Sequence, residues 1–298
     1  MRFEQLSYLE AALRTGSFRQ AAKELGVSQP TITMQVQRLE EDLGVILVLR
    51  DAHGVRPTYA AERILPHVVA AIRAEHAMRQ EASSLENLKV GNLRLAVVPT
   101  ASDTIMPGVV KRLHDEHPSI RFEVAEGGSD MVRHGVQTGH FDAGLLTYLG
   151  FDELADDLHY VDLLTGHLVL CVPEDHPIAD KDEVTAADLA GEPLVFFSKG
   201  SILRRAFERL VADVETNVVY TTDGVKAAQR MVQAGVGISL ANTLSPYTAS
   251  GDGVILVPIR EDWARATLAA VVRKDEARPA VVQTFLRLLK EAAHPPRR

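Results

Sequence analysis

The stretch GSFRQAAKELGVSQPTITMQVQRLEEDLG, residues 16–44, constrains the fold of this chain more than any other segment. Its apolar residues recur at helical spacing, but a Gly-Val-Ser-Gln-Pro break at residues 26–30 divides the pattern. Gly26 suits the left-handed backbone of a helix end, Ser28 suits an N-cap, and Pro30 suits the first turn of a helix. We therefore expect two short helices joined by a tight turn.

A third helix is expected before this pair, over about residues 4–14, with Gly16 ending it and Ser17 capping the helix over 18–25. The last helix begins after Ser28, and its outward side is polar but mostly uncharged. Such an edge suits the DNA major groove, where Gln pairs with adenine and Thr contacts a thymine methyl group or a phosphate. The residues predicted to face the core are Phe3, Leu6, Leu9, Ala12, Leu13, Ala21, Ala22, Leu25, Val27, Ile32, Val36, Leu39 and Leu43.

The segment that follows predicts a β-hairpin, or wing. Residues 45–49 have the pattern of a short strand, residues 51–54 that of a turn, and residues 55–56 that of a return strand. The wing would carry three side chains toward the DNA backbone or minor groove, namely Arg50, His53 and Arg56. The alternative interpretation is a small three-helix bundle that contacts protein.

The pattern FRQAAKELGVSQPTITMQVQRLEEDLGV, followed by LVLRDAHGVRPTYAAE, resembles the N-terminal domain of LysR-type transcriptional regulators. The resemblance is most specific over residues 3–65, and it implies that the third helix reads the operator's major groove while the wing touches the minor groove. Met34 stands where an arginine is frequent in the family, and His53 stands where a basic residue is usual, so we expect weaker salt dependence and altered base preference. The DNA-binding set is Ser28, Gln29, Pro30, Thr31, Thr33, Met34, Arg38, Arg50, His53 and Arg56.

Charge and cysteine content limit the alternatives. The chain has 298 residues, enough for about two domains, and a net charge of −8. Basic and acidic side chains balance within residues 1–58, so the acidic excess lies in residues 59–298, and DNA binding must be argued from the motif alone. Cys171 is the single cysteine, which excludes an intramolecular disulfide and fits the reducing cytoplasm. No apolar run is long enough to span a membrane, so we expect a cytoplasmic protein.

A long linker helix is predicted from Tyr59 to about Asn87, capped by Thr58. At 1.5 Å per residue its length would be roughly 43 Å, and Pro66 should kink it early. Pairing with a second copy is favoured over packing on its own chain, and the family resemblance implies a homodimer or a dimer-of-dimers homotetramer. The predicted heptad seam is Ala61, Ile64, Val68, Ala71, Glu75, Met78, Ala82 and Leu85.

From Gly91 onward, apolar runs alternate with amphipathic stretches, which predicts an α/β fold with mostly parallel sheets. The buried strands are expected at 93–98, 120–126, 141–146, 167–172, 193–197, 217–221, 235–241, 253–259 and 267–272. The helices are expected at 102–117, 129–139, 184–190, 201–213, 223–234 and 278–292. The resemblance implies a two-lobed, periplasmic-binding-protein-like effector domain. The domains are then 1–58 (winged helix-turn-helix), 59–89 (linker and dimerisation helix) and 90–298 (effector domain), with lobe I at 91–161 plus 267–298 and lobe II at 162–266.

Hydroxyl-bearing and glycine residues follow several of these strands, where helix N-termini favour anions. Together they predict a site for a small anionic effector in the cleft between the lobes. Taken singly, each of them is more often an ordinary helix cap. The predicted effector-binding set is Thr100, Ser102, Gly128, Ser129, Thr147, Ser198, Gly200, Ser201 and Thr222.

Motifs for catalysis, cofactors and metals are missing from the sequence. His114 and His117 have no nearby third metal ligand, and the Gly-Val-Gly at 235–237 lacks the third glycine of a dinucleotide loop. We therefore expect a LysR-type regulator without enzymatic activity, cofactor or metal, whose partners are double-stranded operator DNA and a small molecule. The alternatives are a small-molecule-binding protein or enzyme of periplasmic-binding-protein-like fold with an N-terminal oligomerisation bundle, and a structural nucleoid protein.

Overall fold

A computed structural model of the chain describes residues 1–51, 54–85, 91–198, 201–248, 251, 253–274 and 278–294. The side chains of residues 51, 76, 77, 79–85 and 91 lie outside this description. The chain divides into two compact units, one comprising Met1–Leu85 with the short stretch Thr138–His140, and the other comprising the remainder. Each unit is described here by itself. No helix in the described residues is long and apolar enough to cross a membrane.

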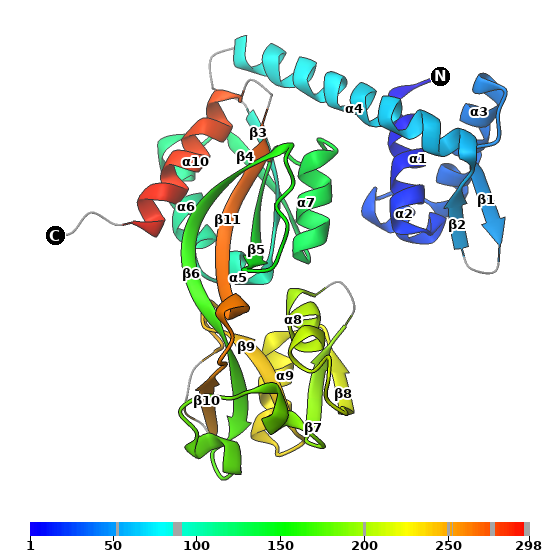
Figure 1. Ribbon diagram of the computed structural model, residues 1–298. Coiled ribbons are helices and arrows are strands. Elements are labelled where there is room, and N and C mark those ends of the chain that lie inside the picture. Colours follow the sequence, from blue (N-terminus) through cyan, green and yellow to red (C-terminus); the bar gives the residue numbers. More distant parts are fainter. Residues whose placement is uncertain are drawn as a thin grey trace. The chain divides into compact units, whose positions relative to one another are not determined.

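The first unit is a winged helix-turn-helix (Figure 1). Its elements are α1 (Phe3–Thr15), α2 (Phe18–Glu24), α3 (Gln29–Leu43), β1 (Val48–Asp51), β2 (Gly54–Pro57) and α4 (Tyr59–Leu85). The predicted helix ends and caps are confirmed. Gly16 and Gly26 have left-handed φ values of 64° and 63°. The Ser17 hydroxyl accepts a hydrogen bond from the Gln20 N–H, and the Ser28 hydroxyl accepts one from the Thr31 N–H. The strands β1 and β2 pair antiparallel.

Most of the predicted core residues of this unit are buried, but two predictions are wrong. Phe3 is 51% exposed because it is the first residue of α1, and Leu43 is 38% exposed because it is the last residue of α3, where Gly44 turns the chain away. The first strand also begins later than predicted, at Val48, and Ile46 is 69% exposed. The buried core includes Leu6, Leu9, Ala12, Ala21, Ala22, Ile32, Val36, Leu39, Leu47 and Val55.

The linker helix α4 is capped as predicted, because the Thr58 hydroxyl accepts a hydrogen bond from the Ala61 N–H at 3.1 Å. Ala61, Val68 and Ile72 are buried in the core of the first unit. The first half of the predicted seam therefore packs on its own chain, which was the alternative to pairing. Further along, the seam residue Met78 is 64% exposed.

The second unit is built on one large mixed sheet (Figure 1). Its strands are β3 (Gly91–Val97), β4 (Ile120–Glu126), β5 (Ala143–Leu149), β6 (Leu158–Pro173), β7 (Pro193–Phe197), β8 (Asn217–Thr222), β9 (Ile238–Asn242), β10 (Val254–Pro258) and β11 (Arg265–Arg273). Its α-helices are α5 (Pro99–Asp103), α6 (Met106–Glu116), α7 (Ser129–Gln137), α8 (Ile202–Leu210), α9 (Val225–Gln233) and α10 (Ala280–Ala293). The predicted helix at 102–117 is thus split in two, and the one at 184–190 is a 3₁₀ turn at Ala186–Leu189.

The strand order is β4-β3-β5-β11-β6-β9-β7-β8, with β10 added to β6. The pairs β3/β4, β3/β5, β7/β8 and β7/β9 are parallel. The pairs that involve β6 or β11 are antiparallel. The expectation of mostly parallel pairing is therefore wrong in the described residues, because the two long strands that connect the lobes run against their neighbours.

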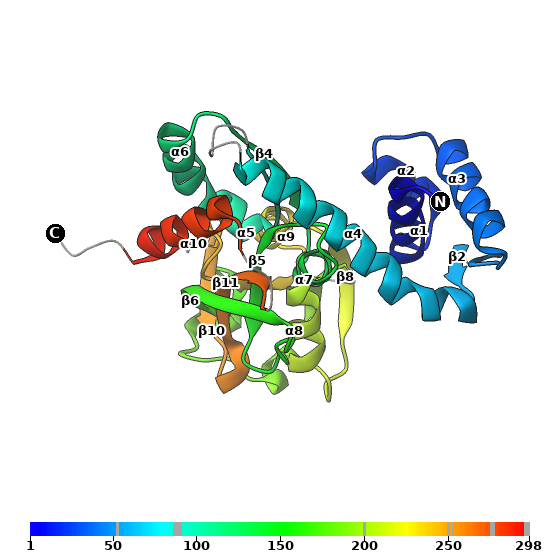
Figure 2. The ribbon, with the colours of Figure 1, turned by 90° about the horizontal axis from the view of Figure 1, so that it is seen from above.

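Two hydrophobic cores define two lobes in this unit. The core of lobe I contains Phe285 of α10 and Leu145 of β5, while the core of lobe II contains Phe197 of β7 and Phe207 of α8. Figures 1 and 2 show α6 and α10 together on one side of the lobe I strands and α7 on the other. The strand β6 enters both cores, with Leu163 in lobe I and Leu168 in lobe II.

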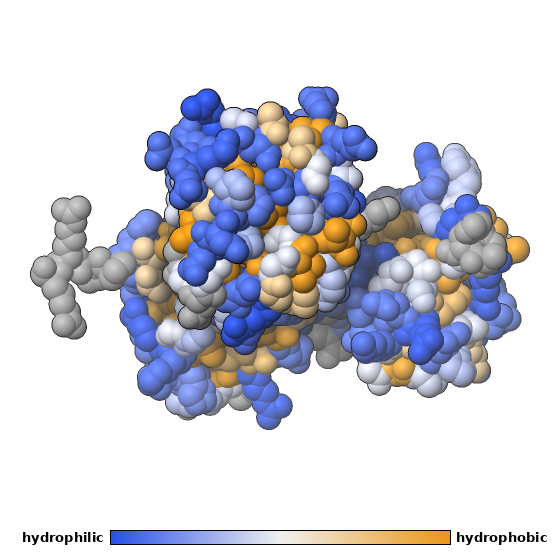
Figure 3. Space-filling model, turned by 90° about the horizontal axis from the view of Figure 1, so that it is seen from below, coloured by the Kyte–Doolittle hydropathy of each residue, from blue (hydrophilic) through white to orange (hydrophobic). Residues whose placement is uncertain are grey.

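Two strands predicted to be buried are exposed edge strands instead. Val124 in β4 is 48% exposed, and Val218, Val219 and Tyr220 in β8 are each at least 39% exposed. These strands stand at the two ends of the sheet order, so each pairs on only one side in the described residues. Figure 3 shows that one face of the second unit carries apolar residues among hydrophilic ones.

Candidate DNA-binding and effector-binding sites

Helix α3 is held by one face and presents the other to solvent. Ile32, Val36 and Leu39 are each completely buried. The residues of the predicted DNA-binding set on the opposite side are exposed, namely Ser28, Gln29, Pro30, Met34 and Arg38, and Thr31 and Thr33 are half-buried. The buried stripe fixes the rotation of the helix, and the polar N-terminal edge is therefore free to meet a partner.

The start of α3 is organised by Ser28 and Thr31. The Ser28 hydroxyl accepts the Thr31 N–H at 3.3 Å, and the two hydroxyl oxygens lie 2.7 Å apart. Because these hydroxyls are engaged with each other, they are less available to a partner than the exposed side chains of Gln29 and Met34. The cap makes the helix begin abruptly, at Gln29, with Pro30 in its first turn.

The wing is anchored to the helices at one close approach. The Val55 N–H donates to the Gly16 carbonyl at 2.9 Å, and a Cβ on Gly54, whose φ is +112°, would lie 2.5 Å from the same oxygen. Only glycine allows the second strand to pass so near the end of α1.

The basic residues of the wing differ in how they are held. The Arg50 guanidinium lies over the ring of Phe18, 4.8 Å from its centroid, and Arg50 and Arg56 are both exposed. His53 lies outside the described residues. A cation stacked on a ring has fewer rotamers to lose when it meets a phosphate than a free side chain has.

An ion-pair network joins α1 to α2. Arg14 contacts Glu10 at 3.1 Å and Glu24 at 2.5 Å. Burial disfavours the charged guanidinium, but the hydrogen bond and charge of Glu24, together with Glu10, outweigh it and raise the pKa of Arg14. The network therefore stays charged and fixes the angle at which α2 supports α3.

In lobe I, two residues of the predicted effector set contact each other. The Ser129 hydroxyl, at the start of α7, donates to the Thr147 carbonyl at 2.6 Å and accepts the Thr147 N–H at 3.2 Å. Both residues are buried, at 2% and 3% exposure. Ser129 thus ties α7 to the end of β5, and its only hydroxyl proton is already used. Gly128, just before it, is exposed.

Thr100 and Ser102 lie on the short helix α5, directly after β3. Both are half-buried, and neither side-chain hydroxyl makes a hydrogen bond within the described part of the chain. The Val98 N–H donates to the Leu145 carbonyl at 2.9 Å, so α5 begins beside β5. The two hydroxyls are therefore available donors near the carboxyl ends of β3 and β5.

In lobe II, the ends of β7 and β8 and the start of α8 meet. The Ser198 N–H donates to the Thr222 carbonyl at 3.1 Å, and the Ser201 N–H donates to the Ser198 carbonyl at 3.3 Å. The Ser201 hydroxyl accepts the Leu203 N–H and caps α8. Gly200 lies outside the described residues. Ser198, Ser201 and Thr222 are thus brought together, as Ser129 and Thr147 are in lobe I.

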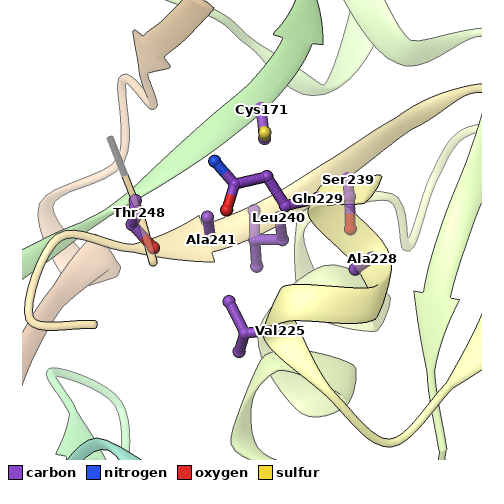
Figure 4. Close-up of a pocket in the computed structure, with 8 residues that line it drawn as sticks. All are labelled: Cys171, Val225, Ala228, Gln229, Ser239, Leu240, Ala241 and Thr248. Carbon is purple, nitrogen blue, oxygen red and sulfur yellow. The ribbon is translucent and has the colours of Figure 1, made fainter. Parts of the chain in front are cut away.

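A small pocket, partly open to solvent, lies elsewhere in lobe II, between α9 and β9 (Figure 4). None of the predicted effector residues line it. The Ser239 hydroxyl on its wall donates to the Val195 carbonyl, and the thiol of Cys171 is buried, which raises its pKa to about 12. Its lining is Cys171, Val225, Ala228, Gln229, Ser239, Leu240, Ala241 and Thr248, mostly apolar, so we interpret it as imperfect packing.

An ion pair that the sequence did not predict lies beside the predicted effector residues. Arg205 in α8 contacts Asp152, just after β5, with Nη1 and Oδ1 2.6 Å apart. Next to it, Arg209 stacks on Phe151 and Trp263. Asp152 and Arg205 are 53 positions apart in the sequence, so no local spacing pattern predicts their contact. The local signal is a predicted hydroxyl residue before each of them: Thr147 lies five positions before Asp152, and Ser201 lies four positions before Arg205.

The described residues contain no group of three or more His, Cys, Asp or Glu side chains that could hold a metal ion.

Comparison with known proteins agrees with this architecture. Residues 3–62 match the model of the bacterial regulatory helix-turn-helix protein, lysR family, and residues 86–294 match the LysR substrate binding domain. The DNA-binding transcriptional dual regulator OxyR of Escherichia coli (strain K12) is 29% identical over 279 residues, which is 92% of this chain and 90% of that protein. The uncharacterized HTH-type transcriptional regulator YybE of Bacillus subtilis (strain 168) is 26% identical over 88% of each chain.

Solved structures share the fold across the whole chain. A full-length OxyR variant from Pseudomonas aeruginosa has a TM-score of 0.63 at 21% identity and covers 97% of this chain and 95% of its own. The LysR family regulator CbnR, solved with its target DNA, has a TM-score of 0.57 at 22% identity and covers 98% of this chain and 100% of its own. The two family matches together span most of the sequence, and this protein therefore belongs to the LysR family of bacterial transcriptional regulators.

Proposed function

We propose that the exposed N-terminal edge of α3 reads an operator sequence in the major groove, with Gln29, Thr33 and Met34 at the bases and Arg38, Arg50 and Arg56 at the phosphates. The observation that carries this proposal is the division of α3 into a completely buried stripe and a capped, polar outer edge. Since its relatives are transcriptional regulators, we infer a regulatory role in the cytoplasm, where operator DNA lies, and not an enzymatic one.

A gel-shift experiment tests this proposal. The full chain is titrated at moderate salt against duplex DNA from upstream of its own gene, with a shuffled duplex of the same composition as control. We expect a preference for the upstream DNA of about 10³-fold or more, as specific binding usually shows over non-specific binding. Equal affinity for both duplexes would contradict the proposal.

The effector is proposed to be a small anion bound between the lobes. Thr100 and Ser102 in lobe I and Ser198 in lobe II offer hydroxyls that make no hydrogen bond in the described part of the chain. Ser129, Thr147 and Thr222 support these positions through hydrogen bonds to neighbouring strand and helix ends. Hydroxyl donors near helix N-termini favour an anion, and an anion bound to both lobes favours one lobe arrangement over others.

A thermal-shift screen of metabolite anions against the full chain tests this assignment. A ligand that binds the native state raises its stability with concentration. We expect the shift to fall when Thr100 or Ser198 is replaced by Val. A ligand that stabilises both variants as well as the original chain binds elsewhere.

A thiol is not proposed as the sensor, although several relatives are named hydrogen peroxide-inducible genes activators. Cys171 is the only cysteine, so the chain has no partner for an intramolecular disulfide. Its side chain is 2% exposed and its pKa is raised, whereas oxidation by peroxide requires an accessible thiolate.

The oligomer is proposed to be a homodimer, which supports two half-sites on DNA. Met78, in the second half of α4, exposes an apolar side chain that the winged domain does not use. Val218, Val219 and Tyr220 expose apolar side chains on the edge strand β8, and we infer that a second copy of this chain covers this edge. Sedimentation equilibrium should give at least twice the monomer mass of 32.6 kDa. A strictly monomeric chain at micromolar concentration would contradict the assignment.

A further inference from the structure

Asp152 is a nearly buried carboxylate held in a two-pronged ion pair. Its side chain is 3% exposed. Arg205 Nη1 lies 2.6 Å from Oδ1, and Arg205 Nη2 lies 3.4 Å from Oδ2. Oδ2 also accepts the Leu149 N–H at 2.8 Å, so Asp152 closes the end of β5 as well as holding the arginine. The contact has the geometry by which proteins usually bind a free carboxylate.

The guanidinium of Arg205 is only partly satisfied. Both Nη atoms face Asp152, but Nε is buried and finds no hydrogen-bond partner among the residues that the structure describes. The side chain as a whole is 33% exposed, so solvent or a ligand has access to it. A buried guanidinium donor without an acceptor costs free energy, so the contact with Asp152 leaves part of the guanidinium unsatisfied.

This pair lies among the predicted effector residues. Arg205 stands one helical turn after Ser201, and its N–H donates to the Ser201 carbonyl. Because helical side chains lean toward the helix N-terminus, the guanidinium extends back over the first turn of α8. Asp152 follows Leu149, the last residue of the strand that carries Thr147. The pair therefore connects α8 of lobe II to the end of β5. This strand has Leu145 in the lobe I core and its last residue, Leu149, in the lobe II core.

We propose that Arg205 is the residue that binds the effector's carboxylate, and that Asp152 is an internal carboxylate that occupies Arg205 when the effector is absent. This inference rests on the proposed effector site and narrows its ligands to carboxylates. An effector carboxylate takes the guanidinium from Asp152, so α8 loses its link to the end of β5. The exchange gives the ligand a physical means of changing the arrangement of the two lobes.

Acetate is the probe for this exchange, because it reproduces the Asp side-chain carboxylate. The full chain carrying Asp152→Ala is melted in sodium acetate and in sodium chloride at equal ionic strength. We expect a lower melting temperature than that of the original chain, and a saturable rise with acetate but not with chloride. The double variant Asp152→Ala/Arg205→Met should show no acetate-specific rise.

Asp142→Ala is the matched control, because the Asp142 side chain is also 3% exposed and pairs with Arg94 at 2.9 Å. This pair lies elsewhere, in the middle of β3 and just before β5. If acetate stabilises this control or the double variant as much as Asp152→Ala, the proposal is overturned. No acetate-specific effect in Asp152→Ala overturns it as well.

Asp152→Asn provides a second test that does not create a cavity. Its neutral amide no longer competes with acetate for the charge of Arg205. Acetate should therefore bind to this variant at least about ten times more tightly than to the original chain, which corresponds to a difference in binding free energy of roughly 1.4 kcal/mol. Equal acetate affinity in the two proteins would overturn the proposal. Operator binding by Asp152→Asn and by the original chain is measured in parallel by gel shift. If the original chain shows no sequence preference, the proposed regulatory function fails, whereas the acetate result still tests the role of Arg205.

Discussion

The Arg50 guanidinium lies 4.8 Å from the ring centroid of Phe18. Phe18, the first residue of α2, therefore positions the positive charge that Arg50 carries on β1. Phe18 is 7% exposed and belongs to the core, whereas Arg50 is exposed. The ring therefore links the packing of the winged domain to a charge on its surface. The contact is worth about 0.5–1 kcal/mol at such a site, which is enough to hold a preferred rotamer.

Replacing Arg50 by Gln should weaken binding to operator and to shuffled DNA by similar factors, because a phosphate contact carries no sequence information. The slope of log affinity against log salt should become shallower by about 1, the value expected for one lost phosphate contact. Fluorescence anisotropy over a salt series measures both quantities. Arg260→Gln, in the second unit, is the control and should leave the slope unchanged; an unchanged slope for Arg50→Gln would mean that Arg50 only stabilises the fold.

Replacing Gln29 by Ala should instead reduce sequence preference. Gln29 is exposed at the first residue of α3 and is proposed to read a base edge, a contact worth about 1–3 kcal/mol of discrimination. Competition assays with operators substituted one base pair at a time measure the effect. We expect the loss to fall on one position in each half-site, and an undiminished preference at every position would show that another part of α3 reads the bases.

The two glycines at positions 54 and 26 should respond differently to alanine. Both have positive φ, but a Cβ on Gly54 would lie 2.5 Å from the Gly16 carbonyl oxygen, whereas a Cβ on Gly26 meets nothing within 4 Å. Gly26→Ala should therefore cost roughly 1–2 kcal/mol from backbone strain alone. Gly54→Ala should cost about 3 kcal/mol or more, because the wing must also move. Denaturant unfolding of both variants decides this, and equal costs would contradict the close approach.

The thiol of Cys171 should be inert in the native protein. Burial raises its pKa from 9.0 to about 12, so it stays protonated at neutral pH. We expect no labelling by iodoacetamide at about pH 8, below the ordinary thiol pKa, until the chain is unfolded, with the product counted by intact mass. The shift stabilises the fold below pH 9, where the unfolded thiol is also protonated, and this contribution is lost as the pH rises toward 12. Rapid labelling of the native chain would show that the side chain opens to solvent.

Local chemistry in the sequence was sufficient to predict the winged domain. Gly16, Gly26, Ser17 and Ser28 act through their own backbone or through residues three positions away, so their roles do not depend on the rest of the fold. Periodicity was less reliable at element ends: Leu43 continues the apolar stripe of α3 but falls where the helix has already left the core.

Relations between distant segments could not be predicted from the sequence. The apolar run at Val218–Tyr220 has the composition of a buried strand, and its exposure follows only from its place at the end of the sheet. The pairing of Asp152 with Arg205 likewise depends on how α8 docks beside the end of β5. The hydroxyl residues at the strand ends were predictable in kind, whereas which of them are already hydrogen-bonded, such as Ser129, was not.

The strand β6 has a mechanical consequence. Its sixteen residues, Leu158–Pro173, contribute side chains to both cores without interruption. Neither lobe can melt without fraying the strand on which the other depends, so heating should produce one cooperative loss of both cores. A change in the twist of β6 in one lobe is accordingly passed along the same strand to the other lobe.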